Sequence, residues 1–167
     1  MSGGRTNTRE IAELALLTAL TVGGKEAMSA LPSINPVTLL LLLAAIVYGA
    51  RALYVALGFA VLEIGLYGLG LWNLMYLYLW PGLVLAALPF RQNRSRLFWA
   101  AFAGIFGLGF GALCAIPYLF LGGWTAAVSW WVAGIPFDLL HCAGNAALAG
   151  LLLLPLVDLV TKLKKRS

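Results

Sequence analysis

The stretch Pro136-Phe-Asp-Leu-Leu-His-Cys-Ala-Gly-Asn-Ala-Ala-Leu-Ala-Gly-Leu-Leu-Leu-Leu-Pro-Leu-Val-Asp-Leu-Val160 is apolar over a length that can cross a bilayer, which takes about 20 helical residues. Its first half nevertheless carries three polar side chains, Asp138, His141 and Asn145. Their spacing places them on one face of a helix. Because polar groups in a membrane segment usually face a protein interior or an aqueous cavity, we expect this face to line a solute site.

The rest of the chain has the same apolar character. Hydrophobic residues make up 62% of the sequence and charged residues 10%, and the mean hydropathy is +0.95. These values predict an integral membrane protein, folded as one domain over residues 1–167. No cleavage pattern follows the polar N-terminus, so we expect no removed signal peptide. Cys114 and Cys142 lie in apolar segments, where they are interpreted as small apolar fillers, with a disulfide or metal pair as the alternative.

Apolar segments separated by turn residues predict an all-α bundle of six transmembrane helices. Residues 36–71 are divided into two spans, because a single helix would reach about 54 Å across a hydrocarbon core of about 30 Å. Residues 122–134, which include three tryptophans, are expected to form a loop or an interfacial segment. The predicted spans cover approximately residues 11–31, 36–49, 52–71, 73–90, 97–121 and 136–160.

The basic residues predict the orientation of these helices. Ten of the eleven lysines and arginines fall at the termini or in alternate connections, which places both termini in the cytoplasm by the positive-inside rule. The net charge of +5 therefore requires no nucleic-acid partner, and the basic tail is expected to meet anionic lipid or a cytoplasmic protein. The residues concerned are Arg5, Arg9, Arg51, Arg91, Arg94, Arg96, Lys162, Lys164, Lys165 and Arg166.

The remaining charges within the predicted spans share one depth. Lys25 and Glu63 fall in the same half of the membrane as Asp138 and His141, on the side away from the basic residues. Each has a structural alternative: Asp138 near Pro136 can cap a helix, His141 can bond another helix, and Lys25 and Glu63 can pair with each other. The shared depth favours a site that loads from outside.

Aromatic residues are skewed to the same side, where five of the six tryptophans are expected and only Trp99 maps to the cytoplasmic side. A belt at both interfaces does not produce this asymmetry. Flat amphipathic rings around a few polar groups suit a ring-bearing ligand about the size of a vitamin.

Catalytic and cofactor motifs are missing from the sequence. Gly23-Gly-Lys25 has Ala19 where a phosphate-binding loop needs glycine, and no metal-ligand spacing or nucleophile elbow occurs. We therefore expect no enzyme, cofactor or metal, and uphill transport would require energy from a partner. Two alternatives remain open: an intramembrane enzyme with Asp138 and His141 as acid and base, and a structural membrane subunit.

Two runs resemble a known family. Phe106-Gly-Leu-Gly-Phe-Gly-Ala-Leu-Cys-Ala-Ile-Pro-Tyr118 and Trp131-Val-Ala-Gly-Ile-Pro-Phe-Asp-Leu-Leu-His-Cys-Ala-Gly-Asn145 are similar to the substrate-binding S component of energy-coupling factor (ECF) transporters. The resemblance implies capture of a vitamin or related micronutrient at the plasma membrane of a prokaryote. It also implies three partner subunits, a transmembrane coupling protein and two cytoplasmic ATPases.

The resemblance extends to the residues of two contacts. Ala15 and Ala19 match the family's Ala-x-x-x-Ala coupling contact on the first helix, where small residues allow another helix to approach closely. The family's ligand pocket lies mainly on the last three helices and the outer loops. Its implied positions here are Asn73, Tyr76, Tyr118, Trp130, Asp138, His141 and Asn145, and Lys25 and Glu63 are added from their depth. The identity of the ligand does not follow.

Overall fold

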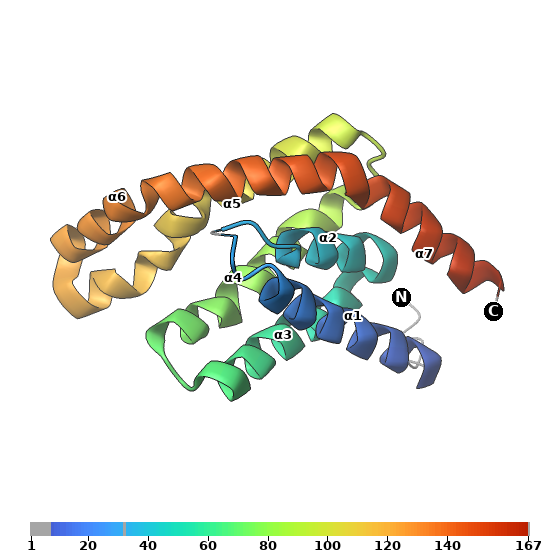
Figure 1. Cartoon of the computed structure of the whole chain (residues 1–167), viewed down its shortest axis with the longest axis horizontal. Helices are drawn as coiled ribbons and strands as arrows, with labels where there is room; N and C mark the ends of the chain where they lie inside the picture. Colours follow the sequence, from blue (N-terminus) through green and yellow to red (C-terminus); the bar gives the residue numbers. More distant parts are fainter. Residues whose placement is uncertain (1–7, 32, 167) are drawn as a thin grey trace.

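The computed structural model describes residues 8–31 and 33–166, which form helices joined by short turns, with no strand among them. The predicted all-α class is confirmed (Figure 1). The α-helices are α1 (Thr8–Ala27), α2 (Val37–Tyr48), α3 (Ala52–Tyr67), α4 (Leu71–Ala87), α5 (Arg96–Cys114), α6 (Ile116–Leu148) and α7 (Leu154–Arg166). Two 3-10 turns, η1 (Gly49–Arg51) and η2 (Leu88–Phe90), and a π-helical segment, η3 (Ala149–Leu153), complete the described chain.

Four helical stretches are long and apolar enough to cross a membrane. They are Val37–Tyr67, Leu71–Phe90, Arg96–Cys114 and Ile116–Lys165. The first contains a chain reversal at Gly49, whose φ of 62° is available to glycine at little cost, so it consists of the two helices α2 and α3. Helix α1 is not among them, because charged residues occupy both of its ends. The structure thus supports a membrane protein, and the count of six spans stays a prediction.

Helix α2 lies at the centre of the bundle. It contacts α1, α3, α4 and α7, and eight of its residues from Val37 to Ala45 are buried. Since nearly every segment of the chain is apolar, hydropathy does not distinguish this helix from its neighbours. Its leucines are enclosed by protein on several sides, whereas α1 and α3 leave one apolar face exposed.

Helices α5 and α6 pack closely because glycines on α5 face α6. A Cβ atom on Gly107 would lie 2.7 Å from the backbone carbonyl of His141, closer than real side chains approach. Gly104 likewise faces Cys142 and Ala146. The absence of side chains along this face of α5 brings the two backbones together and fixes the part of α6 that carries Asp138 and His141.

Two predictions about this region are wrong. Of the two alternatives for residues 122–134, a loop or an interfacial segment, the loop is wrong: the chain is helical from Trp124 onward, and the break is confined to Gly122 and Gly123, where φ reaches 71° at Gly123. Helix α5 also ends at Cys114 rather than near residue 121, because Pro117 lacks an N–H group for the helix ladder. Pro136 consequently lies inside α6 rather than in its first turn.

Helices α1 to α6 alternate in direction and α7 continues α6, which separates two ends of the molecule (Figure 1). At one end, called the basic end, Arg51 binds Glu10 at 2.7 Å, Arg9 binds Glu13 at 2.8 Å, and Lys164 reaches Glu13 at 3.7 Å. The opposite end, called the pocket end, collects the end of α1, the start of α4 and the end of α5 around a cavity. Helix α1 stops at Ala27, so residues 28–31 of the expected first span lie in turns instead.

Candidate binding site

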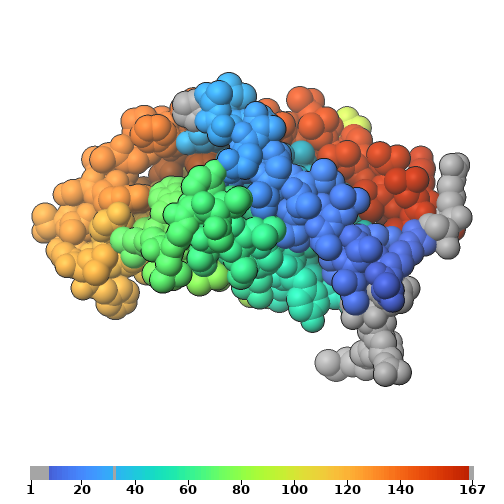
Figure 2. All heavy atoms as spheres, turned by 60° about the horizontal axis from the view of Figure 1, so that its bottom comes forward, coloured from blue at the N-terminus to red at the C-terminus, as the bar shows by residue number. Residues whose placement is uncertain are grey.

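The pocket end encloses a cavity of about 590 Å³, within the range of roughly 300–1,000 Å³ typical of small-molecule sites. Figure 2 shows the surface hollowed between the light-blue segment of residues 28–31 and 33–36 and the orange part of α6. Ile34 of this segment packs against Gly144 of α6. The walls combine this segment with residues of α1, α2, α3, α4, α5 and α6. The lining residues are Lys25, Glu26, Met28, Ser29, Leu31, Ser33, Asn35, Val37, Tyr67, Trp72, Tyr76, Trp80, Phe110, Gly111, Trp130, Ala133, Gly134, Phe137, Asp138 and His141.

Aromatic rings from α4 and α5 form one wall of the pocket. Trp72, Tyr76 and Trp80 follow each other at intervals of four residues and so share a face of α4. The Trp72 indole N–H donates to the Tyr76 hydroxyl at 2.9 Å, and the Tyr76 and Trp80 ring centroids are 5.4 Å apart. Phe110 of α5 continues the wall, 5.7 Å from Trp80. The indole Nε1 of Trp80 is buried and has no partner among the described residues.

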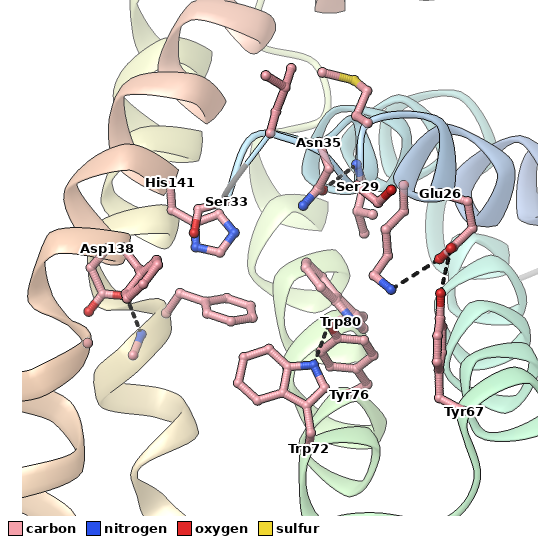
Figure 3. A pocket seen from close by; sticks show the side chains of 18 of the residues that line it. Glu26, Ser29, Ser33, Asn35, Tyr67, Trp72, Tyr76, Trp80, Asp138 and His141 are labelled. Atoms are coloured by element: carbon pink, nitrogen blue, oxygen red, sulfur yellow. Dashed lines mark hydrogen bonds and ion pairs between the residues drawn. The ribbon is translucent and has the colours of Figure 1, made fainter.

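Asp138 lies on α6, across the pocket from this wall, with its carboxylate turned toward Gly111 of α5 (Figure 3). Its side chain is 3% exposed. One carboxylate oxygen accepts a hydrogen bond from the Gly111 backbone N–H at 2.8 Å, and the other, Oδ2, has no partner in the described part of the chain. A Cβ atom at position 111 would collide with the carboxylate, so glycine is needed there. Asp138 therefore does not cap its own helix, which excludes that alternative.

His141 lies one turn from Asp138 and lines the same pocket. Its ring is 4.7 Å from Phe110, centroid to centroid. The ring atom Nδ1 is buried and, within the described residues, unpaired. The residues of the pocket thus include a carboxylate oxygen, an imidazole nitrogen and an indole N–H that no described residue satisfies. Buried polar atoms of this kind usually bind a ligand or ordered water.

A second polar group lies across the pocket on α1 and α3. The Lys25 ammonium is 2.6 Å from Glu63 Oε2 and 3.4 Å from Glu26 Oε1, and it sits 4.9 Å from the centroid of the Tyr67 ring. The Tyr67 hydroxyl donates to the other Glu26 oxygen. Glu63 is only 1% exposed, and its Oε1 has no partner among the described residues. The predicted alternative that Lys25 and Glu63 pair is confirmed, while Lys25 also lines the pocket.

The structure gathers five of the nine predicted ligand residues on the pocket wall: Lys25, Tyr76, Trp130, Asp138 and His141. Glu63 and Tyr118 stand one contact behind it, Tyr118 stacked on Trp130 at 5.1 Å. The Asn73 side chain donates to the Gly68 carbonyl at 2.6 Å and so holds the turn between α3 and α4. Asn145 is buried further along α6 and does not line the pocket.

Sequence reasoning did not select several lining residues. The interval of four residues between Trp72, Tyr76 and Trp80 was a signal that could have added both tryptophans. Glu26 follows Lys25 directly, and its contribution depends on where α1 ends. Ser29, Ser33 and Asn35 lie in an irregular segment, where no periodicity indicates which side chains face inward.

The described residues contain no group of three histidine, cysteine or acidic side chains that could hold a metal ion. Cys114 and Cys142 are free, so the alternative of a disulfide between them is excluded. Asp138 and His141 accordingly stand as isolated polar groups on the wall of an aromatic pocket. The arrangement is suited to holding a small molecule by stacking and directed polar contacts.

No model of a known protein family matches the chain, and neither a curated protein nor a solved structure matches it.

Proposed function

We propose that this chain is the substrate-binding S component of an ECF-type importer, which captures a vitamin-sized solute from outside the cell. The observation that carries the proposal is the pocket itself, with unpaired polar atoms of Asp138, His141 and Trp80 around an aromatic wall. A membrane subunit with a purely structural role has no need for such a pocket. Buried polar atoms without partners destabilise a fold unless a bound ligand satisfies them.

The proposal includes a topology of six spans with both termini in the cytoplasm of a prokaryotic cell. Helix α1 then serves as the first span, and the pocket end faces outward. The clustering of basic residues at the opposite end supports this orientation, since positively charged segments are retained in the cytoplasm. A solute arriving from outside reaches the pocket without crossing the bundle.

The proposal also assigns a docking face for the coupling protein to α1. Ala15 and Ala19 are both exposed, and Gly23 continues the row with open space where its Cβ would be. Leu16 and Leu20 beside them are half exposed or more, so this face remains apolar and smooth. Small residues at this spacing allow a second helix to pack closely within a membrane. Two ATPase subunits bound to the coupling protein would supply the energy for release inward.

Two measurements test the proposal. Native mass spectrometry of the chain, gently released from detergent, is expected to show a retained small molecule. The chain is also expected to co-purify with one membrane subunit and two ATPases, and Ala15→Leu with Ala19→Leu should abolish this association while the small molecule is retained. Ala101→Leu, at an exposed small residue of α5, is the matched control. A chain that carries no molecule and associates with no ATPase contradicts the proposal.

A further inference from the structure

The charges around the pocket differ in sign from those of the chain as a whole. The protein carries a formal net charge of +5. Lys25 is the one lysine or arginine among the described lining residues; it contacts two carboxylates, Glu26 and Glu63, and a third, Asp138, lines the pocket as well. With a neutral imidazole at His141, the formal charge of this group is −2. A strongly basic membrane protein therefore holds an acidic site at the end farthest from its other basic residues.

Asp138 is the carboxylate of this group that lacks a positively charged partner among the described residues. Lys25 is already engaged by Glu63 at 2.6 Å and by Glu26 at 3.4 Å. Figure 3 shows Glu26 on the opposite side of the pocket from Asp138. Asp138 Oδ2 has no partner among the described residues, although the side chain is 97% buried. A carboxylate shielded from water is costly unless a cation or several hydrogen-bond donors accompany it. The backbone N–H of Gly111 supplies one donor to the other oxygen only.

The aromatic wall opposite Asp138 also favours a bound cation. The faces of Trp72, Tyr76 and Trp80 carry the negative part of the ring quadrupole, and they line the space between the two polar groups (Figure 3). A cation over such a face within about 6 Å is stabilised by roughly 0.5–2 kcal/mol, most strongly over tryptophan. Aromatic faces and a buried carboxylate together form the usual chemistry of organic-cation recognition.

We infer that the ligand is a ring-bearing organic cation, whose ring stacks on the α4 wall and whose positive charge lies against Asp138 Oδ2. The inference rests on the proposed capture function and adds the ligand class. An anionic solute would place its charge among uncompensated carboxylates, and a neutral one would leave Asp138 without a counter-charge. His141 Nδ1 and the Trp80 indole N–H are positioned to read polar atoms at the edge of the ring.

Three probes that share a pyridine ring and differ in charge test the inference: 1-methylnicotinamide (cation), nicotinamide (neutral) and nicotinate (anion). Tryptophan fluorescence of the purified full chain in detergent is titrated with each. The cation is expected to bind about tenfold or more tightly than nicotinamide, as expected for one charge-assisted contact. Asp138→Asn should remove this preference, so that within the variant the cation and nicotinamide bind with affinities that agree to about twofold, and cooperative thermal unfolding of the variant shows that it is still folded.

Asp158→Asn is the matched control, because it makes the same chemical change at an exposed carboxylate of the basic end. Equal or tighter binding of nicotinamide or nicotinate would overturn the cation inference, as would a preference that survives Asp138→Asn. Failure of all three probes to bind would overturn it as well. The capture function is judged separately by native mass spectrometry, since a retained neutral or anionic molecule would leave it standing.

Discussion

The pocket end and the basic end of the molecule contain the same kinds of charged side chain and arrange them differently. The six acidic residues divide equally between the two ends. At the basic end Glu10, Glu13 and Asp158 each contact a lysine or arginine, and the arginines are between 37% and 55% exposed. At the pocket end Glu63 and Asp138 are almost completely buried, and each has one oxygen with no partner among the residues that the structure describes.

This difference distinguishes charged residues that only stabilise the fold from those that form a binding site. Exposed ion pairs contribute about 0–1 kcal/mol each and require no special surroundings. Buried carboxylates with free oxygens lower stability, so a protein keeps them where something else binds. Partnering and burial separate the two groups more clearly than charge type or position in the sequence.

The largest difference between the two ends is expected in the loss of stability when one carboxylate is removed from each. Glu63→Gln is expected to lower the free energy of unfolding by about 2–3 kcal/mol. The value is below the ~3–5 kcal/mol of a fully buried pair, because Lys25 is 23% exposed and retains Glu26. Glu10→Gln should cost about 0–1 kcal/mol, since its partner Arg51 is partly exposed. Unfolding in mixed detergent micelles measures both, and equal losses would contradict the distinction.

Two glycine substitutions on α5 test whether close helix packing holds the pocket end together. Gly107→Ala places a methyl group 2.7 Å from the His141 carbonyl and should destabilise the α5–α6 contact by about 1–3 kcal/mol. Gly109→Ala, on the same helix but with no atom within 4 Å, should stabilise the chain by up to about 1 kcal/mol through helix propensity. Thermal unfolding of both variants in the same detergent gives the difference. If the two variants melt alike, the glycines do not set this contact.

The smallest effect is expected at the basic end. Arg94→Gln removes the contact with Asp158, in which both side chains are about half exposed, and should cost at most about 1 kcal/mol. In 1 M salt even this loss should vanish, because the Debye length falls to about 3 Å. The loss from Glu63→Gln should persist in the same salt. Unfolding at low and high salt compares the two, and a large salt-resistant loss at Arg94 would place it with the buried group.

The apolar sequence predicted helices well, because a chain in lipid must satisfy its backbone within each segment. Helix ends were harder to place. Residues 122–134 contain tryptophans and glycines typical of a loop, yet only Gly122 and Gly123 leave the helix. The stop at Cys114 depended on Pro117, whose effect an apolar run conceals.

Polar residues in an apolar background made the core of the site predictable. Asp138, His141 and Lys25 stand out in the sequence, and the structure places all three on the pocket wall. Asn73 shows the limit of this reasoning: it bonds the Gly68 carbonyl at a turn, and sequence spacing does not reveal such a local partner. The contribution of residues 28–31 and 33–36 was also hidden, since it arises from how they fold over the bundle, where Ile34 packs against Gly144.

The π-helical segment Ala149–Leu153 sets the rotation of the last helix relative to the pocket. A π turn accommodates one extra residue, and each helical residue turns the chain by about 100°. A single deletion within this segment can therefore be absorbed, because it turns the π segment into ordinary α-helix. A single deletion between Leu154 and Val157 has no such reserve and would rotate the rest of α7 by roughly a quarter turn, carrying Asp158 and Lys164 away from Arg94 and Glu13. In genetic terms, a one-residue deletion should be tolerated inside the π segment and not in the first turn of the helix that follows it.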